Sequence, residues 1–431
     1  MRTTDNNGGK KIDDFNEVNI TDLQLIANKS LLDLQKKNKN LLVFPQSFIH
    51  YKDNIEKSQI FSLNEEKLTT NNLMGFIGCN NSKLTITSRF AKNDKNDYFL
   101  HYMLQRVFSI NLLDFNQRRG EESIWDFLIY LFPYFLKKAH SQGIYKAYKK
   151  ENYNDSNVKG VIDVKRHIHK NIPFMGKVAY KTQELSYDNY LTQLIRHTIE
   201  YIKVHRYGAG ILTNEGDIRD IVNEFTFITN KSYNRNSRQK IISLNLKIFS
   251  HPYFTEYTFL QKICLQILRQ EKTTFGEERD KVYGLLFDGA WLWEEYLNKV
   301  FKDCDFKHPE NKTSSGAIHL FENPKSYRRY PDFWKESFVL DAKYKNLSDY
   351  IDRDDIHQLI SYMYVLKAEQ GGFIYPTKKT KGIDCKNIGD LFGYGGNIKT
   401  WAIPIPQESA SFIDFKKEME MNEKELTSHL K

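Results

Sequence analysis

The segment Ser337–Tyr344 constrains the fold more than any other stretch of the sequence. Its letters, SFVLDAKY, predict a β-strand. Because successive side chains of a strand point to opposite faces, Asp341 and Lys343 share one face while Leu340 and Ala342 share the other. The apolar pair can pack under a helix, and the polar pair can face a cleft. The segment therefore predicts a sheet with one packed face and one charged face.

A second acid lies upstream of this strand. Asp332 follows Pro331 and precedes Asp341 by nine residues, across a predicted tight turn near residues 336 and 337. The two acids are therefore expected to lie roughly opposite each other, where they could hold Mg²⁺, a hard cation that prefers oxygen ligands. The ion would polarise a scissile phosphate and help to generate hydroxide, and Lys343 would orient the water or stabilise developing charge. The alternative is that Asp332 is a turn residue and that Asp341 pairs with Lys343 on an exposed strand.

The elements around these acids follow a definite order. The patterns predict a helix, three strands, a helix and two further strands, at Lys281–Phe301, Ile318–Phe321, Tyr327–Trp334, Ser337–Tyr344, Asp352–Leu366, Gly372–Tyr375 and Thr400–Ile405. Helix, three strands, helix, strand is the core order of the restriction-endonuclease-like fold. Residues 281–406 are therefore expected to form a nuclease domain of the PD-(D/E)xK type.

Two helical residues are candidates for supporting roles at this site. Glu294 borders the apolar stripe of the first helix, where it could reach a metal as a third carboxylate; otherwise it is an ordinary surface acid beside Glu295. Gln358 and Tyr362 are four residues apart and share one face of the second helix. In many such nucleases a pair of this kind lines the cleft beside the metal. A solvated helix face is the alternative.

Basic side chains near the acids are candidates for contacts with DNA phosphates. The predicted contacts are Arg328, Arg329, Lys378 and Lys379. A solvated charge run is the alternative. His167 and His169 lie two apart in a predicted strand, and without a partner cluster they are expected to be surface residues rather than metal ligands.

Charge and cysteine usage narrow the class of protein. The net charge of +9 and pI near 9.0 are compatible with nucleic acid as a partner but indicate it only weakly. The four cysteines lie far apart and form no CxxC pair, which argues against a zinc module or a disulfide framework and fits a reducing cytoplasm. The strongly apolar stretch at 127–136 is about half the length that a bilayer requires, and residues 1–14 lack the apolar core of a signal peptide. We expect a cytoplasmic protein with no membrane contact.

A chain of 431 residues is expected to form two or three domains. We expect an α+β multidomain chain with a small mixed α/β N-terminal domain, a mainly helical middle region and the C-terminal restriction-endonuclease-like α/β domain. The predicted segments are a disordered start at 1–14, the N-terminal domain at 15–115, the middle region at 116–280, the nuclease domain at 281–406 and a charged tail at 407–431. In the middle region, strands are predicted at Tyr145–Glu151 and Val158–His167, followed by helices at Asn189–Val204, Glu215–Phe227 and Tyr257–Arg269.

An ordered set of short motifs resembles the McrC family, the nuclease subunits of McrBC-type and LlaJI-type restriction systems. The likeness extends over roughly residues 20 to 405. It rests on Gly75–Gly78, Leu84–Phe90, Phe99–Leu104, Lys159–Asp163, Leu292–Tyr296, Tyr330–Asp332, Leu340–Tyr344 and Gln358–Tyr362. Asp341 stands at a position where the family pattern allows aspartate or glutamate, so metal binding is expected to be preserved.

The resemblance implies a function and a partner. It implies a Mg²⁺-dependent endonuclease that cuts double-stranded DNA when assembled with an McrB-like AAA+ GTPase ring, as part of phage defence. The GTP would be bound by the partner, and this sequence agrees because it has no GxxxxGK[ST] phosphate loop. Residues 15 to about 270 would dock on the ring and stimulate hydrolysis. The partner would read DNA sequence or methylation.

Two other functions remain open. The chain could be a non-catalytic stimulator of an AAA+ motor with a decayed nuclease fold, although the intact Asp332, Asp341 and Lys343 speak against this. It could also be a stand-alone nuclease that acts in repair or on RNA. The long N-terminal portion would then need another explanation.

Overall fold

The computed structural model divides into two compact units. Unit 1 combines residues 1–117 with 275–431, and unit 2 comprises residues 118–274. The residues that the structure describes are 1–14, 20–38, 41–45, 58–64, 66–79, 82–92, 97–108, 123–205, 208–213, 215–269, 282–309, 317–378, 382–393 and 395–430. The chain is thus of the mixed α/β, multidomain class that the sequence predicts.

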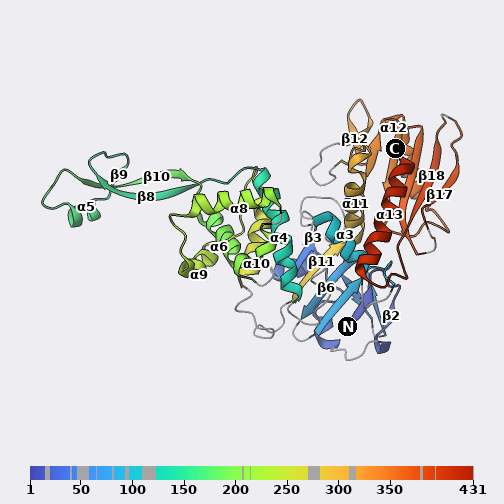
Figure 1. The fold of residues 1–431 in the computed structure, drawn as a ribbon, viewed down its shortest axis with the longest axis horizontal. Coiled ribbons are helices and arrows are strands. Elements are labelled where there is room, and N and C mark those ends of the chain that lie inside the picture. The colour runs from blue at the N-terminus through green and yellow to red at the C-terminus, as the bar shows by residue number, and fades with distance from the viewer. Residues whose placement is uncertain are drawn as a thin grey trace. The chain divides into compact units, whose positions relative to one another are not determined.

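The first sheet of unit 1 combines four strands from the N-terminal part of the sequence with one strand from residues 282–288. Its strand order is β1-β7-β6-β11-β3, with bounds β1 Arg2–Thr4, β3 Leu41–Phe44, β6 Leu73–Cys79, β7 Ser82–Thr87 and β11 Val282–Asp288. Strand β11 runs antiparallel to β6 and parallel to β3. A smaller sheet, β2-β5-β4, and helices α1 and α2 complete this part; their bounds are β2 Lys10–Lys11, β4 Phe61–Leu63, β5 Lys67–Thr70, α1 Ile20–Gln24 and α2 Leu31–Lys37. The segments expected as separate domains at 15–115 and 281–406 therefore lie in one unit (Figure 1).

The position of β11 corrects the helix predicted at Lys281–Phe301. Residues 282–288 form a strand, and helix α11 covers only Gly289–Val300. The boundary is set by Asp288, whose side chain accepts a hydrogen bond from the backbone N–H of Trp291 at 2.9 Å and so caps the helix. The close pairing of β11 and β6 also explains Gly75. Its φ is +129°, and a Cβ atom there would lie 2.1 Å from the backbone oxygen of Leu285.

The start of the chain is ordered, which corrects the expectation of disorder over residues 1–14. Strand β1 pairs in parallel with β7. Asp5, which follows β1, is fully buried, and its carboxylate lies 2.6 Å from the guanidinium of Arg89. This polar segment is held by strand pairing at a sheet edge and by a buried ion pair. It has no apolar periodicity, so the sequence alone did not predict its structure.

Asp97 is a buried acid at the start of α3 (Tyr98–Phe108). It accepts hydrogen bonds from the backbone N–H groups of Ser88 at 2.5 Å and Leu100 at 2.9 Å, while burial raises its pKa from 3.8 to about 7. Because the pKa is higher in the folded state, the stability that this group contributes is full below about pH 4 and is lost as the pH rises through about 7. Between pH 5 and pH 8, we expect wild-type stability to fall by about 3 kcal/mol relative to Asp97→Asn. Urea unfolding at both pH values measures this difference, and a difference that does not change with pH would contradict the assignment.

The second sheet of unit 1 carries the predicted acids. Its order is β14-β15-β16-β18-β17, with β15, β16 and β18 parallel and the two edge strands antiparallel. The strands are β14 Phe333–Lys335, β15 Phe338–Ala342, β16 Gln370–Thr377, β17 Asp384–Asp390 and β18 Asn397–Pro404. Helix α12 (Arg353–Leu366) packs on one face, where Leu359 and Met363 join Val339 and Phe373 in a buried cluster. Leu340 and Ala342 are buried too, so both faces are covered. Asp341 shares the α12 face with Val339.

The strand predicted at Tyr327–Trp334 is divided in two. Its first part is β13 (Ser326–Arg329), which forms a separate hairpin with β12 (Ile318–Phe321), and its second part is β14. Pro331 lies between them. Proline has no backbone N–H to donate to a neighbouring strand. The pairing of β13 with β12 therefore ends before Pro331, and the pairing of β14 with β15 begins after it.

The segment predicted as a charged tail at 407–431 contains a packed helix, α13 (Phe412–Leu430). Phe415 and Met419 are buried among other apolar side chains. The buried carboxylate of Glu423 accepts hydrogen bonds from Tyr102, Tyr296 and Arg106, at distances of 2.7, 2.8 and 2.6 Å. Because these partners come from α3 and α11, α13 is part of the core of unit 1 rather than a free end.

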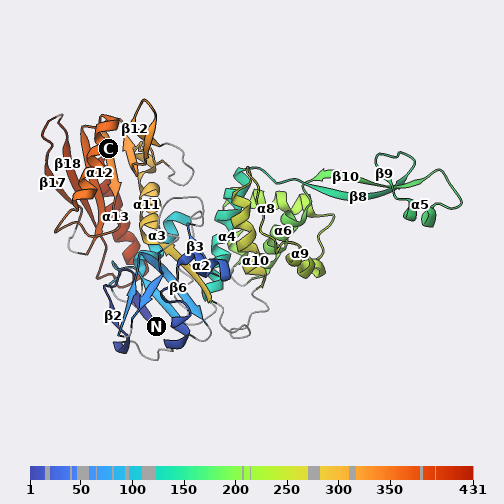
Figure 2. The same ribbon diagram turned by 180° about the vertical axis from the view of Figure 1, so that it is seen from behind.

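Unit 2 is a helical bundle with one long β-arm. Its helices are α4 Ser123–Ser141, α6 Tyr190–Val204, α7 Gly208–Ile211, α8 Gly216–Thr229, α9 Arg238–Leu244 and α10 Glu256–Arg269. The arm consists of β8 (Ala147–Asp155), β10 (Val178–Ser186) and the residues between them, and it extends away from the helices of its own unit (Figure 2). Among the described residues, no helix combines the length and the apolar character needed to cross a bilayer.

The distal part of the arm corrects the strand predicted at Val158–His167. Only Val161–Ile162 forms a strand, β9, and helix α5 begins at Val164. Asp163 accepts a hydrogen bond from the backbone N–H of Arg166 at 3.3 Å and caps this helix. His167 therefore lies in a helix, where its Nδ1 atom is 3.3 Å from the backbone nitrogen of Ala179 and accepts its hydrogen.

Candidate active site at the end of strand β15

Asp332 and Asp341 lie opposite each other, as the spacing of the two residues predicts. Strand β14 pairs with β15 in the register Phe333↔Leu340, which places Asp332, one residue before β14, beside Asp341. The Asp332 carboxylate accepts a 2.7 Å hydrogen bond from the backbone N–H of Ala342. This bond fixes the first acid against the strand that carries the second.

The two acids form a strained electrostatic pair. Asp341 is 2% exposed, and burial raises the pKa of Asp332 well above its ordinary value. The negative charges of Glu294 and Asp341 raise the pKa of Asp332 further. Like charges held together at low dielectric are unfavourable unless a cation compensates them, and this arrangement is typical of functional sites.

Lys343 supplies one compensating charge. Its Nζ atom lies 2.8 Å from a carboxylate oxygen of Asp341 and 3.1 Å from one of Asp355. Burial opposes the charge on this lysine, but the two carboxylates together raise its pKa above the ordinary value. Lys343 is therefore held as an ammonium group on the face that carries Asp341.

Helix α12 contributes three polar side chains to the same place. The Oε1 atom of Gln358 lies 3.5 Å from the Nζ atom of Lys343. The amide nitrogen of Gln358 donates a 2.6 Å hydrogen bond to the hydroxyl of Tyr362. The carboxylate of Asp355 bridges Lys343 and Lys345. Asp355 was not among the predicted site residues, although its place three residues before Gln358, on the same helix face, was the available signal.

His308 is a further neighbour that sequence reasoning missed. Its Nδ1 atom lies 2.7 Å from the backbone oxygen of Asp332, and its ring stacks on that of Phe333 at 4.8 Å. This histidine lies in a connecting segment far from the acids in sequence. No local pattern marks it.

Glu294, on α11, lies close enough to influence the charge on Asp332. Within the described part of the chain, however, no three Asp, Glu, His or Cys side chains gather into a group that could hold one metal ion. Asp332 and Asp341 alone still fit Mg²⁺, which usually binds through one or two carboxylates and keeps several waters. A direct bond from Glu294 to a metal remains a prediction.

The basic residues predicted to contact DNA fall into two groups. Arg328 and Arg329 lie exposed on β13, four and three residues before Asp332. Lys378 follows β16, and its Nζ atom donates a 2.7 Å hydrogen bond to the backbone oxygen of Ala91. Lys379 lies outside the described residues. Only the two arginines are therefore placed on an exposed strand close to the acids.

Known proteins resemble this chain in sequence and in fold. The model of a family described as McrBC 5-methylcytosine restriction system component matches residues 68–376. A chain of the refined half-complex from the tetradecameric assembly of Thermococcus gammatolerans McrB AAA+ hexamers with bound McrC shares the fold, with a TM-score of 0.50 and 16% identity over 98% of this chain and 99% of that one. The Thermococcus gammatolerans McrBC complex, determined by cryo-EM, matches at a TM-score of 0.31 and 16% identity over 72% of this chain and 89% of that one. No curated protein sequence matches this chain.

Proposed function

The chain belongs to the family of McrBC 5-methylcytosine restriction system components, and from this we propose that it is the Mg²⁺-dependent, DNA-cutting subunit of such a system. One observation carries the proposal: the paired acids Asp332 and Asp341 lie beside the ammonium group of Lys343. Two carboxylates can hold a divalent metal, and a lysine beside them can stabilise the negative charge that develops during phosphodiester hydrolysis.

The fold of this region supports the same proposal. Helix α11, strands β14 and β15, helix α12 and strands β16 and β18 occur in this order along the chain, and strands β15, β16 and β18 are parallel. We assign this arrangement to the PD-(D/E)xK nucleases. The acids lie on the hairpin β14–β15, which is where the first and second acids of that pattern belong.

Each side chain has a role that its contacts favour. Asp332 and Asp341 would hold Mg²⁺, which when bound polarises the scissile phosphate and lowers the pKa of a bound water. Lys343, fixed between Asp341 and Asp355, would donate a hydrogen bond to the attacking water or to the developing oxyanion. Gln358 would orient the same water from α12. Glu294 would add negative charge that favours the metal.

Exposed arginines beside the site favour DNA as the substrate. Arg328 and Arg329 precede Asp332 on an exposed hairpin, and the whole chain carries a net charge of +9. Contacts from such residues to phosphates position a duplex without reading its sequence. The sequence specificity would then come from the partner.

The β-arm of unit 2 favours docking on another protein. Its distal segment exposes Val161, Ile172, Phe174 and Met175, with exposed fractions of 78, 68, 64 and 81%. Apolar side chains gathered on an exposed projection mark an interaction surface. We propose that this surface binds an AAA+ GTPase ring, which would supply the nucleotide hydrolysis. The part of the chain expected to dock, residues 15 to about 270, is thereby narrowed to the β-arm.

Cleavage of plasmid DNA by the purified chain, with and without the AAA+ protein encoded beside it, tests the proposal. We expect cleavage only when the partner, GTP and Mg²⁺ are all present, and none when EDTA removes the metal. Cleavage by the chain alone without GTP would favour a stand-alone nuclease. Stimulation of the partner's GTPase activity without any cleavage would favour a non-catalytic stimulator.

A further inference from the structure

Tyr344 directly follows the lysine of the candidate site and ends in the first sheet of the same unit. Its side chain is buried, and its hydroxyl shares a 2.7 Å hydrogen bond with Oγ of Ser88 and donates one of 3.2 Å to Sδ of Met74. Met74 lies in β6, and Ser88 follows β7. The end of β15 is therefore attached to a sheet that contains none of the proposed catalytic residues.

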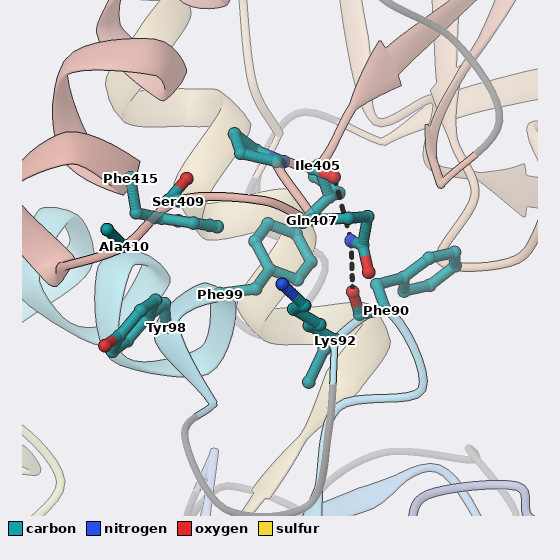
Figure 3. Close-up of a pocket in the computed structure, with 11 residues that line it drawn as sticks. Phe90, Lys92, Tyr98, Phe99, Ile405, Gln407, Ser409, Ala410 and Phe415 are labelled. Carbon is teal, nitrogen blue, oxygen red and sulfur yellow. Dashed lines mark hydrogen bonds between the residues drawn. The ribbon is translucent and has the colours of Figure 1, made fainter.

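The ring of Tyr344 also contacts side chains outside the second sheet. The guanidinium carbon of Arg89 lies 5.1 Å from the ring centroid, and Asp5 fixes that guanidinium through a 2.6 Å ion pair. The ring of Phe90 meets the ring of Tyr344 edge-on at 5.2 Å. Gln407 in turn holds Phe90, because its amide donates a 3.1 Å hydrogen bond to the backbone oxygen of Phe90 (Figure 3). Every one of these neighbours lies outside the sheet that carries Asp341.

Gly289 shows how closely the ring is fitted. A Cβ atom at this position would lie 2.7 Å from Cε1 of Tyr344, so only glycine leaves room for the ring. Gly289 is the first residue of α11, the helix that carries Glu294, and its N–H donates a 2.8 Å hydrogen bond to the backbone oxygen of Asn72. Tyr344 thus sits where the end of β15, the start of α11 and the first sheet meet.

Resting on the nuclease function proposed above, we infer that Tyr344 is a positioning residue for Lys343 and Asp341. It touches neither phosphate nor metal. Its hydroxyl, bound to Ser88 and Met74, fixes the end of β15 against the first sheet, and this sets where the ammonium group of the preceding residue, Lys343, lies relative to Asp332. Catalysis is sensitive to such placement, because a displacement of about 1 Å can lower a rate by roughly a hundredfold.

Tyr344→Phe tests the inference because it keeps the ring and removes only the hydroxyl. In the complex with the partner, we expect kcat for plasmid cleavage to fall about tenfold with KM for DNA unchanged. Calorimetric titration of the full chain with Mg²⁺, without DNA, should show weaker binding. Ser88→Ala removes the other end of the hydrogen bond and should give the same result, with little added loss in the double variant.

Tyr102→Phe is the matched control. Tyr102 is also fully buried, and its hydroxyl donates a 2.7 Å hydrogen bond to Glu423, far along the sequence from β15. This variant should lose a similar amount of stability while keeping wild-type kcat and Mg²⁺ affinity. An equal loss of kcat in Tyr102→Phe, or wild-type kcat and Mg²⁺ affinity in both Tyr344→Phe and Ser88→Ala, would overturn the inference. A wild-type complex that cuts no DNA would overturn the nuclease proposal alone, since the Mg²⁺ titrations would still decide the role of Tyr344.

Discussion

Asp341→Asn is expected to lower DNA cleavage by the partnered protein roughly a thousandfold or more, while stimulation of the partner's GTPase activity stays at the wild-type level. The amide has nearly the same shape as the carboxylate but brings no charge to a metal ion, so one of two predicted ligands is lost. The β-arm proposed to dock on the partner belongs to unit 2, whereas Asp341 lies in unit 1. Parallel assays of plasmid cleavage and GTP hydrolysis measure the two effects.

The free energy of unfolding of Asp341→Asn distinguishes a loss of cleavage at the site from unfolding of the variant. Burial and the charges of Glu294 and Asp341 raise the pKa of Asp332, so an ionised pair of acids is unfavourable in the folded state. Lys343 also has a second carboxylate partner, Asp355, at 3.1 Å, which Asp341→Asn leaves in place. We therefore expect the free energy of unfolding without metal to change by less than about 2 kcal/mol. Asp384→Asn, on the edge strand β17, is the control and should cut DNA like the wild type. Cleavage that survives Asp341→Asn would refute the assignment of the site.

Replacement of both Phe174 and Met175 by aspartate is expected to remove most of the stimulation of the partner's GTPase activity, by at least about thirtyfold. Each side chain is more than half exposed in the free chain, and each would be buried against an apolar surface of the ring. Truncating a well-packed interface residue costs about 2 kcal/mol or more, and an unpaired carboxylate in the interface costs more still. GTP hydrolysis at a fixed partner concentration measures the effect.

The matched control for the arm is Phe227→Asp. Phe227 lies on α8 of the same unit and is 83% exposed, so the change adds a charge to an equally exposed aromatic position outside the arm. Both variants should keep nearly wild-type stability, because all three replaced side chains are more than half exposed in the free chain. Wild-type stimulation by the arm variant would place the docking surface elsewhere in residues 15 to about 270.

Local patterns in the sequence were sufficient to predict the core of the candidate site. The alternation around Asp341 and Lys343 and the short connection back to Asp332 determine a hairpin, and the observed register Phe333↔Leu340 agrees with the expected one. Such features depend on neighbours fewer than ten residues apart. The role of these residues in catalysis remains a prediction.

Long-range pairing explains what the sequence could not reveal. Residues 282–288 read as part of a helix because their apolar run has no partner nearby; β3 and β6, which pair with them, lie some two hundred residues earlier. The packing of helix α13 into the core could not be predicted, because the three groups that bind Glu423 come from α3 and α11. Tyr344 lies in the motif Leu340–Tyr344, but no residue near it in the sequence predicts its contact with Ser88.

The insertion of β11 between β3 and β6 has a consequence for damaged or incomplete chains. The strand comes from the part of the sequence that carries Asp332 and Asp341, and it lies inside a sheet whose other strands all come from residues 2–87. A chain broken anywhere within residues 118–274 leaves an N-terminal fragment without an interior strand and a C-terminal fragment whose β11 has lost both neighbours. Neither fragment can satisfy its backbone hydrogen bonds. Truncation within this range should therefore disrupt the first sheet in both fragments, whichever part of the chain each fragment keeps.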